Sequence, residues 1–523
     1  MNTVSTQSAT TADESAPNTS PEDGQSESHF RGAGTISDPY VVEFSPLDPE
    51  NPQNFASSSK WFFMLLLTLS VFAVTLTSSA YSGSANELFA QFHCSKEVFA
   101  LGIALFVLGF AIGPALWAPL SEIYGRRILF IITHVAMTAF VAGGAGCQSM
   151  PALLVLRFLA GMFGASPLTN SGGVIADLFP PAKRGLAMIL FCTAPFLGPV
   201  TGPILGGFVS MNAGWRWVQG VCAIFVGLVT ILGSVFVPET YGPLILRRKA
   251  QSLSKASGRV YISVLELKST NTSAAAIFRK ALIRPWVLLF LEPIVFMAAT
   301  YLAIIYGSTY MFLPALPIVY EQQRGWSEGV GGLAFVGLVV GMIFGLVYAI
   351  VDDIVRYQKL GKSATPESRL PPGAIGAIAL PIGLFAFAWT NSPDIHWSAS
   401  IILSAPFGFG CVLVFLSCLS YLLDSYTVFA ASALGASAML RAFVATAFPL
   451  FTTQMFDNLG IHWASSIPGF LTLLCLPFPF VMYKYGKMIR MKCKYSNEAA
   501  TILAKMQSEA VPKLEDGTES SPV

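Results

Sequence analysis

The residues Gly113–Arg127, which read G-P-A-L-W-A-P-L-S-E-I-Y-G-R-R, decide the fold. A long apolar segment ends within this stretch, a short charged turn follows, and a second apolar segment begins at Ile128. A helix in hydrocarbon cannot bury the charges of Glu122, Arg126 and Arg127 at its end, so the turn must lie at a membrane surface. Because Lys and Arg are retained on the cytoplasmic side, the two arginines place this turn inside the cell.

The composition also indicates a membrane protein. Of the 523 residues, 54% are hydrophobic and only 11% are charged, whereas roughly a quarter of the residues in soluble domains are charged. The apolar runs are long enough for helices of about 20 residues rather than for the shorter strands of a membrane barrel. The net charge of +2 argues against a polyanionic partner such as nucleic acid. The expected class is an all-α integral membrane protein.

Twelve apolar segments are predicted to span the membrane, and a long polar connection divides them into two groups of six. Two six-span halves are the layout of a secondary transporter built from repeats. The expected domains are a cytosolic tail (1–59), a first six-helix half (60–240), a cytoplasmic linker (241–285), a second six-helix half (286–486) and a cytosolic tail (487–523). The predicted spans are Trp61–Tyr81, Val98–Ala118, Ile128–Cys147, Ala152–Ala176, Gly185–Val209, Trp217–Val237, Trp286–Met311, Gly329–Val351, Gly373–Trp389, Trp397–Leu423, Val428–Met455 and Ile467–Tyr485.

The distribution of basic residues supports this count. With both termini inside, 23 Lys and Arg residues lie in cytoplasmic segments near the membrane, and only Lys96, Arg216 and Arg324 lie in outer loops. If one span were missed or wrongly added, the basic residues would no longer lie mainly on one side of the membrane. Both termini are therefore predicted to be cytoplasmic.

The segments outside the spans are mostly polar. Met1–Ser59 has few apolar residues and no basic, apolar leader, so we expect a disordered tail rather than a signal peptide. The linker contains R-R-K-A at Arg247–Ala250 and the less polar stretch Val260–Leu267, which are compatible with a short surface helix. The eight cysteines are scattered and are interpreted as ordinary apolar side chains, although a disulfide between Cys94 and Cys147 is conceivable because both would face outward.

Two spans carry ridges of glycine at four-residue spacing. Span 5 reads A-P-F-L-G-P-V-T-G-P-I-L-G-G, and a face without side chains lets another helix approach closely. The prolines in it remove backbone donors and should loosen the helix. We expect this ridge to pack against the ridge of span 8 across the boundary between the halves; generic packing within one half is the alternative. The residues are Gly198, Pro199, Gly202, Pro203 and Gly206 in span 5, and Gly337, Gly341 and Gly345 in span 8.

Three ionisable residues within predicted spans are candidates for proton coupling, because charge is costly in hydrocarbon. Arg157 in span 4 is expected to act in coupling, or else to lock neighbouring helices by hydrogen bonds to their backbone carbonyls. Glu292 is the only carboxylate well inside a span, in the inner part of span 7. It is expected to carry a proton reversibly, or else to reach the inner surface or pair with a loop arginine such as Arg284. Arg441 lies near the middle of span 11.

Charged residues of the inner loops are expected to form a network that holds the inner face shut and breaks when it opens. An exposed ion pair contributes only about 0–1 kcal/mol, so several pairs must act together to latch the face. Ordinary solvated loop charges are the alternative. The candidates are Glu122, Arg126, Arg127, Asp177 and Arg184, with Asp424 as their counterpart in the second half.

An aromatic cavity among spans 1, 4, 7 and 10 is the expected path of the substrate. Such a cavity, with few hydrogen-bonding groups, suits flat or greasy organic molecules, although aromatic residues at helical spacing are more often packing than ligand contacts. The candidates are Thr169, Asn170, Tyr306, Tyr310, Phe407 and Phe409, and Phe415 lies in the same span as the last two.

The sequence shows no motif for catalysis. It lacks G-x-x-x-x-G-K-[ST], which excludes an ATP-driven pump on this chain, and its five histidines are isolated. We expect no enzyme activity, no cofactor and no metal.

Taken together, these motifs resemble the major facilitator superfamily, specifically the fungal twelve-span drug:proton antiporters. Gly113–Arg127 is similar to the signature between spans 2 and 3, Arg157 to the span 4 arginine, and the span 5 motif to the antiporter signature. V-P-E-T-Y-G-P-L-I-L-R-R-K-A and Y-L-L-D-S-Y-T-V-F-A-A-S-A fit the same group. The resemblance implies the major facilitator fold, a gating pair of Glu122 with Arg126, and a coupling role for Arg157. Glu122 departs from the aspartate common in the wider superfamily, and Met311–Pro317 is unusually rich in proline.

The expected function is proton-coupled export of small organic molecules, such as drugs or a secondary metabolite, across the plasma membrane by a monomer. A polyamine or organic-acid exporter of the same fold is an alternative, as is a transporter-like solute sensor. The spans contain one carboxylate against two arginines, and a polycation would need several acidic partners. Neutral or anionic cargo is therefore favoured over polyamines.

Overall fold

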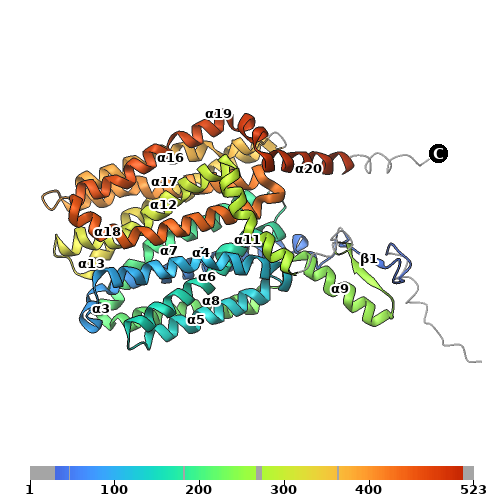
Figure 1. Ribbon diagram of the computed structural model, residues 1–523, viewed down its shortest axis with the longest axis horizontal. Coiled ribbons are helices and arrows are strands. Elements are labelled where there is room, and N and C mark those ends of the chain that lie inside the picture. The colour runs from blue at the N-terminus through green and yellow to red at the C-terminus, as the bar shows by residue number, and fades with distance from the viewer. Residues whose placement is uncertain are drawn as a thin grey trace, which may run out of the picture. The chain divides into compact units, whose positions relative to one another are not determined.

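The computed structural model describes residues 30–45, 47–180, 183–264, 266, 274–361 and 364–510. Its chain divides into two compact units. The smaller unit combines residues 1–46 with Ile245–Asn271, and the larger combines Leu47–Leu244 with 272–523. The larger unit is a bundle of long helices (Figure 1).

Glycines with positive φ set the sharp turns of the first half. Gly125 (φ 97°) separates α4 from α5, and Gly214 (φ 89°) separates α7 from α8. Side chains other than hydrogen rarely allow this conformation, so the chain reverses where these glycines occur. The elements of this half are η1 (Pro52–Asn54), α2 (Ser57–Ala80), η2 (Tyr81–Ser84), α3 (Ala85–Phe92), α4 (Lys96–Tyr124), α5 (Arg126–Ala145), α6 (Met150–Leu178), α7 (Arg184–Ala213) and α8 (Trp215–Phe236).

The second half of the bundle begins with α11 (Ala274–Leu291), which ends just before Glu292. The predicted seventh span was continuous through this residue, and that prediction is wrong because α12 starts anew at Pro293. The remaining elements are α12 (Pro293–Pro317), η4 (Ile318–Gln322), α13 (Glu328–Gly332), η5 (Leu333–Phe335), α14 (Val336–Asp352), η6 (Asp353–Tyr357), α15 (Gln358–Leu360), η8 (Pro366–Arg369), α16 (Pro371–Thr390), α17 (Trp397–Tyr426), η9 (Thr427–Phe429), α18 (Ala430–Cys475), α19 (Pro477–Lys492) and α20 (Lys494–Ala510).

The membrane crossings follow from helix lengths. Eleven apolar helical stretches in the described part of the chain are long enough to cross a membrane, and the longest, Ala430–Lys492, has 63 residues. A helix needs only about 20 residues to cross. Within that stretch Gly460 has φ 72° and ψ 169°, which are not helical, so the chain reverses there and crosses twice. The fold therefore has twelve spans, as predicted.

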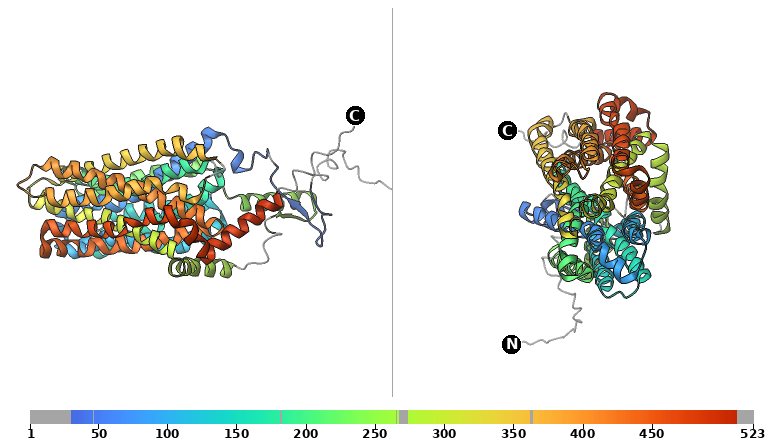
Figure 2. Two further views of the ribbon diagram at one scale, coloured as in Figure 1. Left: turned by 90° about the horizontal axis from the view of Figure 1, so that it is seen from above. Right: turned by 90° about the vertical axis from the view of Figure 1, so that its left-hand side faces the viewer.

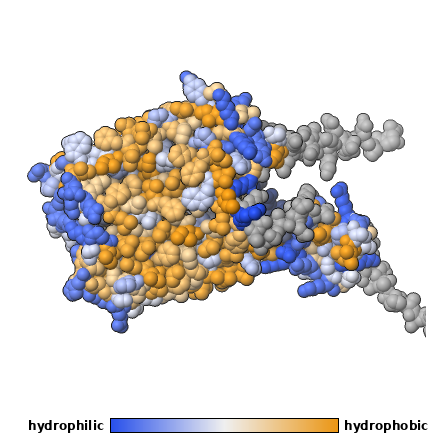
Figure 3. Space-filling view, in the orientation of Figure 1, coloured by the Kyte–Doolittle hydropathy of each residue, from blue (hydrophilic) through white to orange (hydrophobic). Residues whose placement is uncertain are grey.

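Large apolar side chains cover the outside of the bundle. Phe290, Ile224 and Leu474 have exposed fractions of 72%, 64% and 78%. Figure 3 shows hydrophobic residues along the side of the bundle and hydrophilic residues at its two ends. Since lipid tails are as apolar as these side chains, a bilayer can surround this surface without cost.

The two halves of the bundle lie against one another along their length. Figure 2 shows them end on, with the blue-to-green first half beside the yellow-to-red second half. Helix α4 packs against α18, and α7 packs against α13 and α14. We call the end of the bundle that carries Arg126 and Arg369 the basic end, and the other the opposite end.

The smaller unit shows that the amino-terminal tail is not entirely disordered. Strand β1 (Tyr40–Val42) pairs in parallel with β2 (Tyr261–Ser263) of the linker, and Arg259 donates a hydrogen bond to the Tyr40 hydroxyl at 2.8 Å. The predicted linker helix is present as α9 (Gly242–Ser257). Disorder was predicted for all of 1–59, and this is wrong for Tyr40–Val42 and for the start of α2; residues 1–29 lie outside the described residues.

All eight cysteines are free thiols. The conceivable disulfide between Cys94 and Cys147 is therefore not formed in this structure.

Candidate functional site

Arg157 on α6 is buried between helices of the first half. Its side chain is 3% exposed. Nε donates to the carbonyl of Gly102 and Nη2 donates to the carbonyl of Ser78, both at 2.7 Å. The guanidinium also lies over the Tyr81 ring, 4.2 Å from its centroid. These contacts match the predicted lock on backbone carbonyls, but Nη1 is buried without a hydrogen bond.

Ser78 extends this arrangement to the second half. Its hydroxyl forms a 2.8 Å hydrogen bond with the hydroxyl of Tyr310 on α12, and the Tyr310 ring lies 5.1 Å from that of Tyr306. Both tyrosines are almost fully buried. A chain of polar contacts thus runs from Arg157 across the boundary between the halves.

Arg441 on α18 lies at the other side of Tyr306. Its guanidinium carbon is 5.1 Å from the Tyr306 ring centroid and 4.8 Å from that of Phe415. Its Nη1 atom is buried without a hydrogen-bond partner. Phe196 of the first half closes the group, edge-on to Tyr306 at 5.5 Å and to Phe415 at 4.7 Å.

We call Ser78, Arg157, Phe196, Tyr306, Tyr310, Phe415 and Arg441 the interface cluster. It contains two guanidinium groups, and neither forms an ion pair within the described residues. The cluster brings together four of the predicted residues, Arg157, Arg441, Tyr306 and Tyr310.

The other predicted cavity residues lie elsewhere. The Phe407 ring is tilted against that of Phe312, with the centroids 5.4 Å apart, within the second half. The Phe409 ring meets that of Tyr348 on α14, with the centroids 5.9 Å apart. Thr169 and Asn170 hydrogen-bond to positions four residues earlier in their own helix. These four residues therefore do not join the interface cluster, whereas Phe415 does.

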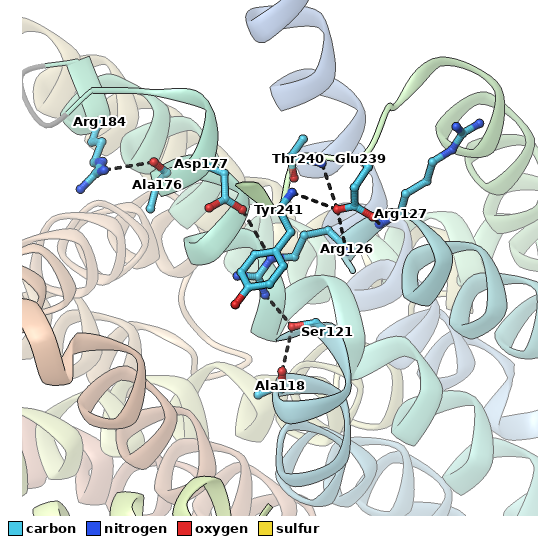
Figure 4. A network of polar contacts seen from close by, with 10 residues as sticks. All are labelled: Ala118, Ser121, Arg126, Arg127, Ala176, Asp177, Arg184, Glu239, Thr240 and Tyr241. Atoms are coloured by element: carbon cyan, nitrogen blue, oxygen red, sulfur yellow. Dashed lines mark hydrogen bonds and ion pairs between the residues drawn. The ribbon is translucent and has the colours of Figure 1, made fainter. Parts of the chain in front are cut away.

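A separate polar network lies at the basic end of the first half (Figure 4). Its centre is Glu239, just after α8. One carboxylate oxygen accepts from the backbone N–H groups of Arg126, Thr240 and Tyr241 at 2.9–3.0 Å, and the other accepts from that of Arg127 at 3.2 Å. The carboxylate thus satisfies the free donors at the start of α5, where the helix dipole also favours negative charge.

The side chain of Arg126, at the start of α5, connects this helix with α4 and α6. Nη1 donates to Ser121 on α4, and Nε lies 3.5 Å from Asp177 on α6. The guanidinium is 5.0 Å from the Tyr241 ring centroid. Burial raises the pKa of Tyr241 to about 12, so the ring stays a neutral phenol at physiological pH.

The structure changes the predicted gating pairs. Glu122 is exposed and has no ion pair among the described residues, so the expected pairing of Glu122 with Arg126 is wrong; Asp177 takes its place. Arg184 binds the carbonyls of Ala176 and Phe179 rather than a carboxylate. Arg127 reaches the carbonyl of Ser234 at 3.0 Å.

The second half carries an equivalent arrangement at the basic end. Arg369 donates to Asp424 at 3.0 Å and lies 3.5 Å from Asp353, while Arg126 in the first half lies 3.5 Å from Asp177. Asp424, which the sequence suggested as the counterpart in the second half, therefore pairs with Arg369. The ion pairs of the described bundle residues at this end lie within one half or the other. Gly185 and Ile189 of the first half line a small pocket together with Asp353 and Arg369 of the second.

Glu292 is placed differently from the prediction. It is 1% exposed and precedes α12 at the basic end. It accepts from the Tyr426 hydroxyl at 2.8 Å and from the backbone N–H of Tyr495, in the first turn of α20, at 2.9 Å. Arg284 does not pair with it, but lies over the ring of Phe429 at 4.1 Å. Glu292 therefore holds the start of the carboxyl-terminal helix rather than lying inside a span.

The glycine ridges pack within their own halves. A Cβ on Gly198 would clash with Thr75 and one on Gly206 with Ala80, both on α2 or at its end. A Cβ on Gly341 would likewise clash with Ala405 on α17. The prediction that the two ridges face each other is wrong, and the alternative is correct, because each ridge admits a neighbour from the same half.

Comparison with known proteins decides the family. The sequence model described as Major Facilitator Superfamily matches residues 67–449, which is well over half of the chain. The chain belongs to the major facilitator superfamily.

Relatives of this facilitator occur in fungi. Major facilitator-type transporter sorT of Penicillium rubens is 64% identical over 483 residues, 91% of this chain and 92% of the relative. MFS-type efflux pump MFS2 of Trichophyton rubrum is 54% identical over 496 residues, 94% of this chain and 83% of the relative. These matches confirm the predicted family resemblance. The protein is a multi-pass membrane transporter of small molecules and not an enzyme.

Solved facilitator structures confirm the fold. The proton:xylose symporter XylE bound to 6-bromo-6-deoxy-D-glucose has a TM-score of 0.60 at 18% identity, over 82% of this chain and 96% of XylE. At this identity the likeness concerns the fold alone.

Sequence reasoning missed two residues that organise this facilitator. Glu239 belongs to V-P-E-T-Y-G-P, which marked the family without any role for its carboxylate. Phe196 belongs to the span 5 motif A-P-F-L-G-P, where only the glycines and prolines drew notice. Both residues stand in motifs that the sequence analysis quoted, but their contacts are with residues far away in the chain.

Proposed function

We propose that the protein exports small organic molecules across the plasma membrane in exchange for protons, with both termini cytoplasmic. The relative from Trichophyton rubrum, 54% identical, is named an efflux pump. The excess of Lys and Arg in the predicted inner segments supports this orientation.

The observation that carries this proposal is the interface cluster. The hydrogen bond between Ser78 and Tyr310 joins the two halves. The buried Arg157 lies on one side of it and the half-buried Arg441 on the other. Charged side chains inside a membrane bundle are costly, so a group of them marks a candidate transport site. We assign the cluster as the place where cargo binds and Arg157 and Arg441 as its charged groups.

Rocking of the two halves would expose this cluster to each side in turn. At the opposite end the halves touch closely, since Glu328 accepts from the backbone N–H of Asn86 at 3.0 Å and Gly207 lies against the backbone of Glu328 and Gly329. At the basic end the halves also touch, since a Cβ on Gly185 of α7 would lie 2.7 Å from Asp353 Oδ1 and 3.2 Å from Arg369 Nη1. The basic-end networks hold the turns of each half as it moves.

Proton coupling is assigned to Arg157 and Glu292. Arg157 cannot lose its proton, so it acts by fixing Ser78 and by its electric field. Glu292 is a buried carboxylate that accepts from the Tyr426 hydroxyl of α17 and from the backbone N–H of Tyr495 in α20, and it loses the second of these donors if α20 moves away. Its release would let it exchange a proton with the cytosol.

The test is transport in proteoliposomes containing the purified protein. A panel of radiolabelled drug-like compounds of neutral, anionic and cationic charge is offered outside, with the lumen made acidic. We expect at least one compound to accumulate inside well beyond its level in protein-free liposomes while the pH gradient lasts, and this excess to disappear when nigericin collapses the gradient. Accumulation that is unchanged after collapse of the gradient would contradict proton exchange.

A further inference from the structure

The two arginines of the interface cluster have no anionic partner. Arg157 keeps one buried N–H group without a hydrogen bond. Arg441 makes neither a hydrogen bond nor an ion pair with any described residue, and its contacts are with the Tyr306 and Phe415 rings. A cation over an aromatic ring gains about 2 kcal/mol when desolvated, whereas burying an unpaired charge costs several kcal/mol.

Arg441 cannot relieve this cost by itself. A guanidinium stays protonated in proteins, so the charge cannot be lost by titration. Two buried carboxylates of the second half already have other partners. Glu292 binds Tyr426 and α20, and Asp353 lies beside Arg369. A ligand that carries a negative charge would compensate the half-buried Arg441 guanidinium.

The surroundings of Arg441 indicate the shape of that ligand. Tyr306 and Phe415 lie beside the guanidinium, and Phe196 from the first half meets both rings edge-on. The buried Tyr306 hydroxyl lies beside that of Tyr310. An aromatic wall with one cation and a tyrosine hydroxyl suits a flat ring that carries a single acidic oxygen group.

We propose that the cargo is an organic anion: a flat aromatic or conjugated body with one oxyanion, such as a carboxylate or an acidic enol. Arg441 and the Tyr306 hydroxyl bind the oxyanion, and Phe415 contacts the aromatic body of the cargo. When the halves part, this aromatic body occupies the position that Phe196 holds in the present structure. The inference rests on the proposed function because it takes the interface cluster as the cargo site.

Equilibrium binding to the purified full-length protein tests this without any gradient. The probes are 2-naphthoate and its neutral amide, 2-naphthamide, which share one ring system and differ in charge. A charged hydrogen bond is worth enough to give naphthoate about 10- to 100-fold tighter binding than the amide. Arg441→Gln should remove this preference, Arg441→Lys should keep part of it, and Arg216→Gln, an arginine at the opposite end, should keep all of it.

Two results would overturn the inference: equal binding of the two probes to the wild type, or no saturable binding of either. An unchanged preference in Arg441→Gln, with a normal melting temperature, would overturn the role of Arg441. If the naphthoate preference is present but transport does not depend on the pH gradient, only the proton coupling in the proposed function is contradicted. The two proposals can therefore be tested separately.

Discussion

Arg157→Ala is expected to abolish transport while the protein still reaches the membrane. The substitution removes both hydrogen bonds to the carbonyls of Gly102 and Ser78 and frees Ser78, which contacts Tyr310 across the halves. Two charged hydrogen bonds are worth enough for a loss of about 100-fold or more in transport rate. Folding should survive because Gly102 lies within α4, where its carbonyl also accepts a helical hydrogen bond.

Measurement of this variant needs initial transport rates together with the amount of protein in the membrane. Arg157→Lys should be intermediate, since an ammonium group lacks the planar fork that reaches two carbonyls at once. Arg248→Ala, an exposed arginine on α9, is the matched control and should behave as the wild type. A wild-type rate in Arg157→Ala would reduce Arg157 to a structural residue.

Glu239→Gln is expected to destabilise the basic end of the first half. The carboxylate accepts from four backbone N–H groups, and an amide in its place would turn an NH₂ group toward some of these donors. Lost charge and lost acceptors at a helix start together cost on the order of 2–4 kcal/mol. The expected readouts are a melting temperature several degrees lower in detergent, and faster trypsin cleavage after Arg126 or Arg127.

The control for this variant is Glu122→Gln, less than one turn before the same loop. Glu122 is exposed and forms no ion pair among the described residues, so melting and trypsin cleavage should not change. If Glu122→Gln lowered the melting temperature more than Glu239→Gln, the gating pair suggested by family resemblance would be right and the geometry of Figure 4 would be misleading.

The sequence predicts the fold and the location of charge well, because both depend on local properties. The position of each span depends on the hydropathy of its own residues, and its orientation depends on the basic residues that flank it. Arg157 was singled out because any charge in a span is costly, and it is buried in the interface cluster. The helix break at Gly460 lies a few residues before the predicted twelfth span, within the range that pattern reading allows.

The sequence predicts partners poorly, because partners depend on contacts between distant segments. The four-residue spacing of the glycines can be seen in the sequence. The sequence does not show that α2 and α17 are the helices that pack on them. Glu239 lies 113 residues from Arg126 in the chain, and no local pattern links them. Glu292 was read as part of a span because Leu288–Leu291 is apolar, while its role depends on Tyr495, about 200 residues later.

The central claim is that the halves move against each other about the interface cluster. Asn86→Cys with Glu328→Cys places two thiols across the halves at the opposite end, where the structure is closed. Joining them with a short reducible cross-linker should stop transport, and reduction should restore it; the pair Arg324→Cys with Ser392→Cys, within the second half, should have no effect. Full transport by protein that is quantitatively cross-linked between residues 86 and 328 would contradict the account.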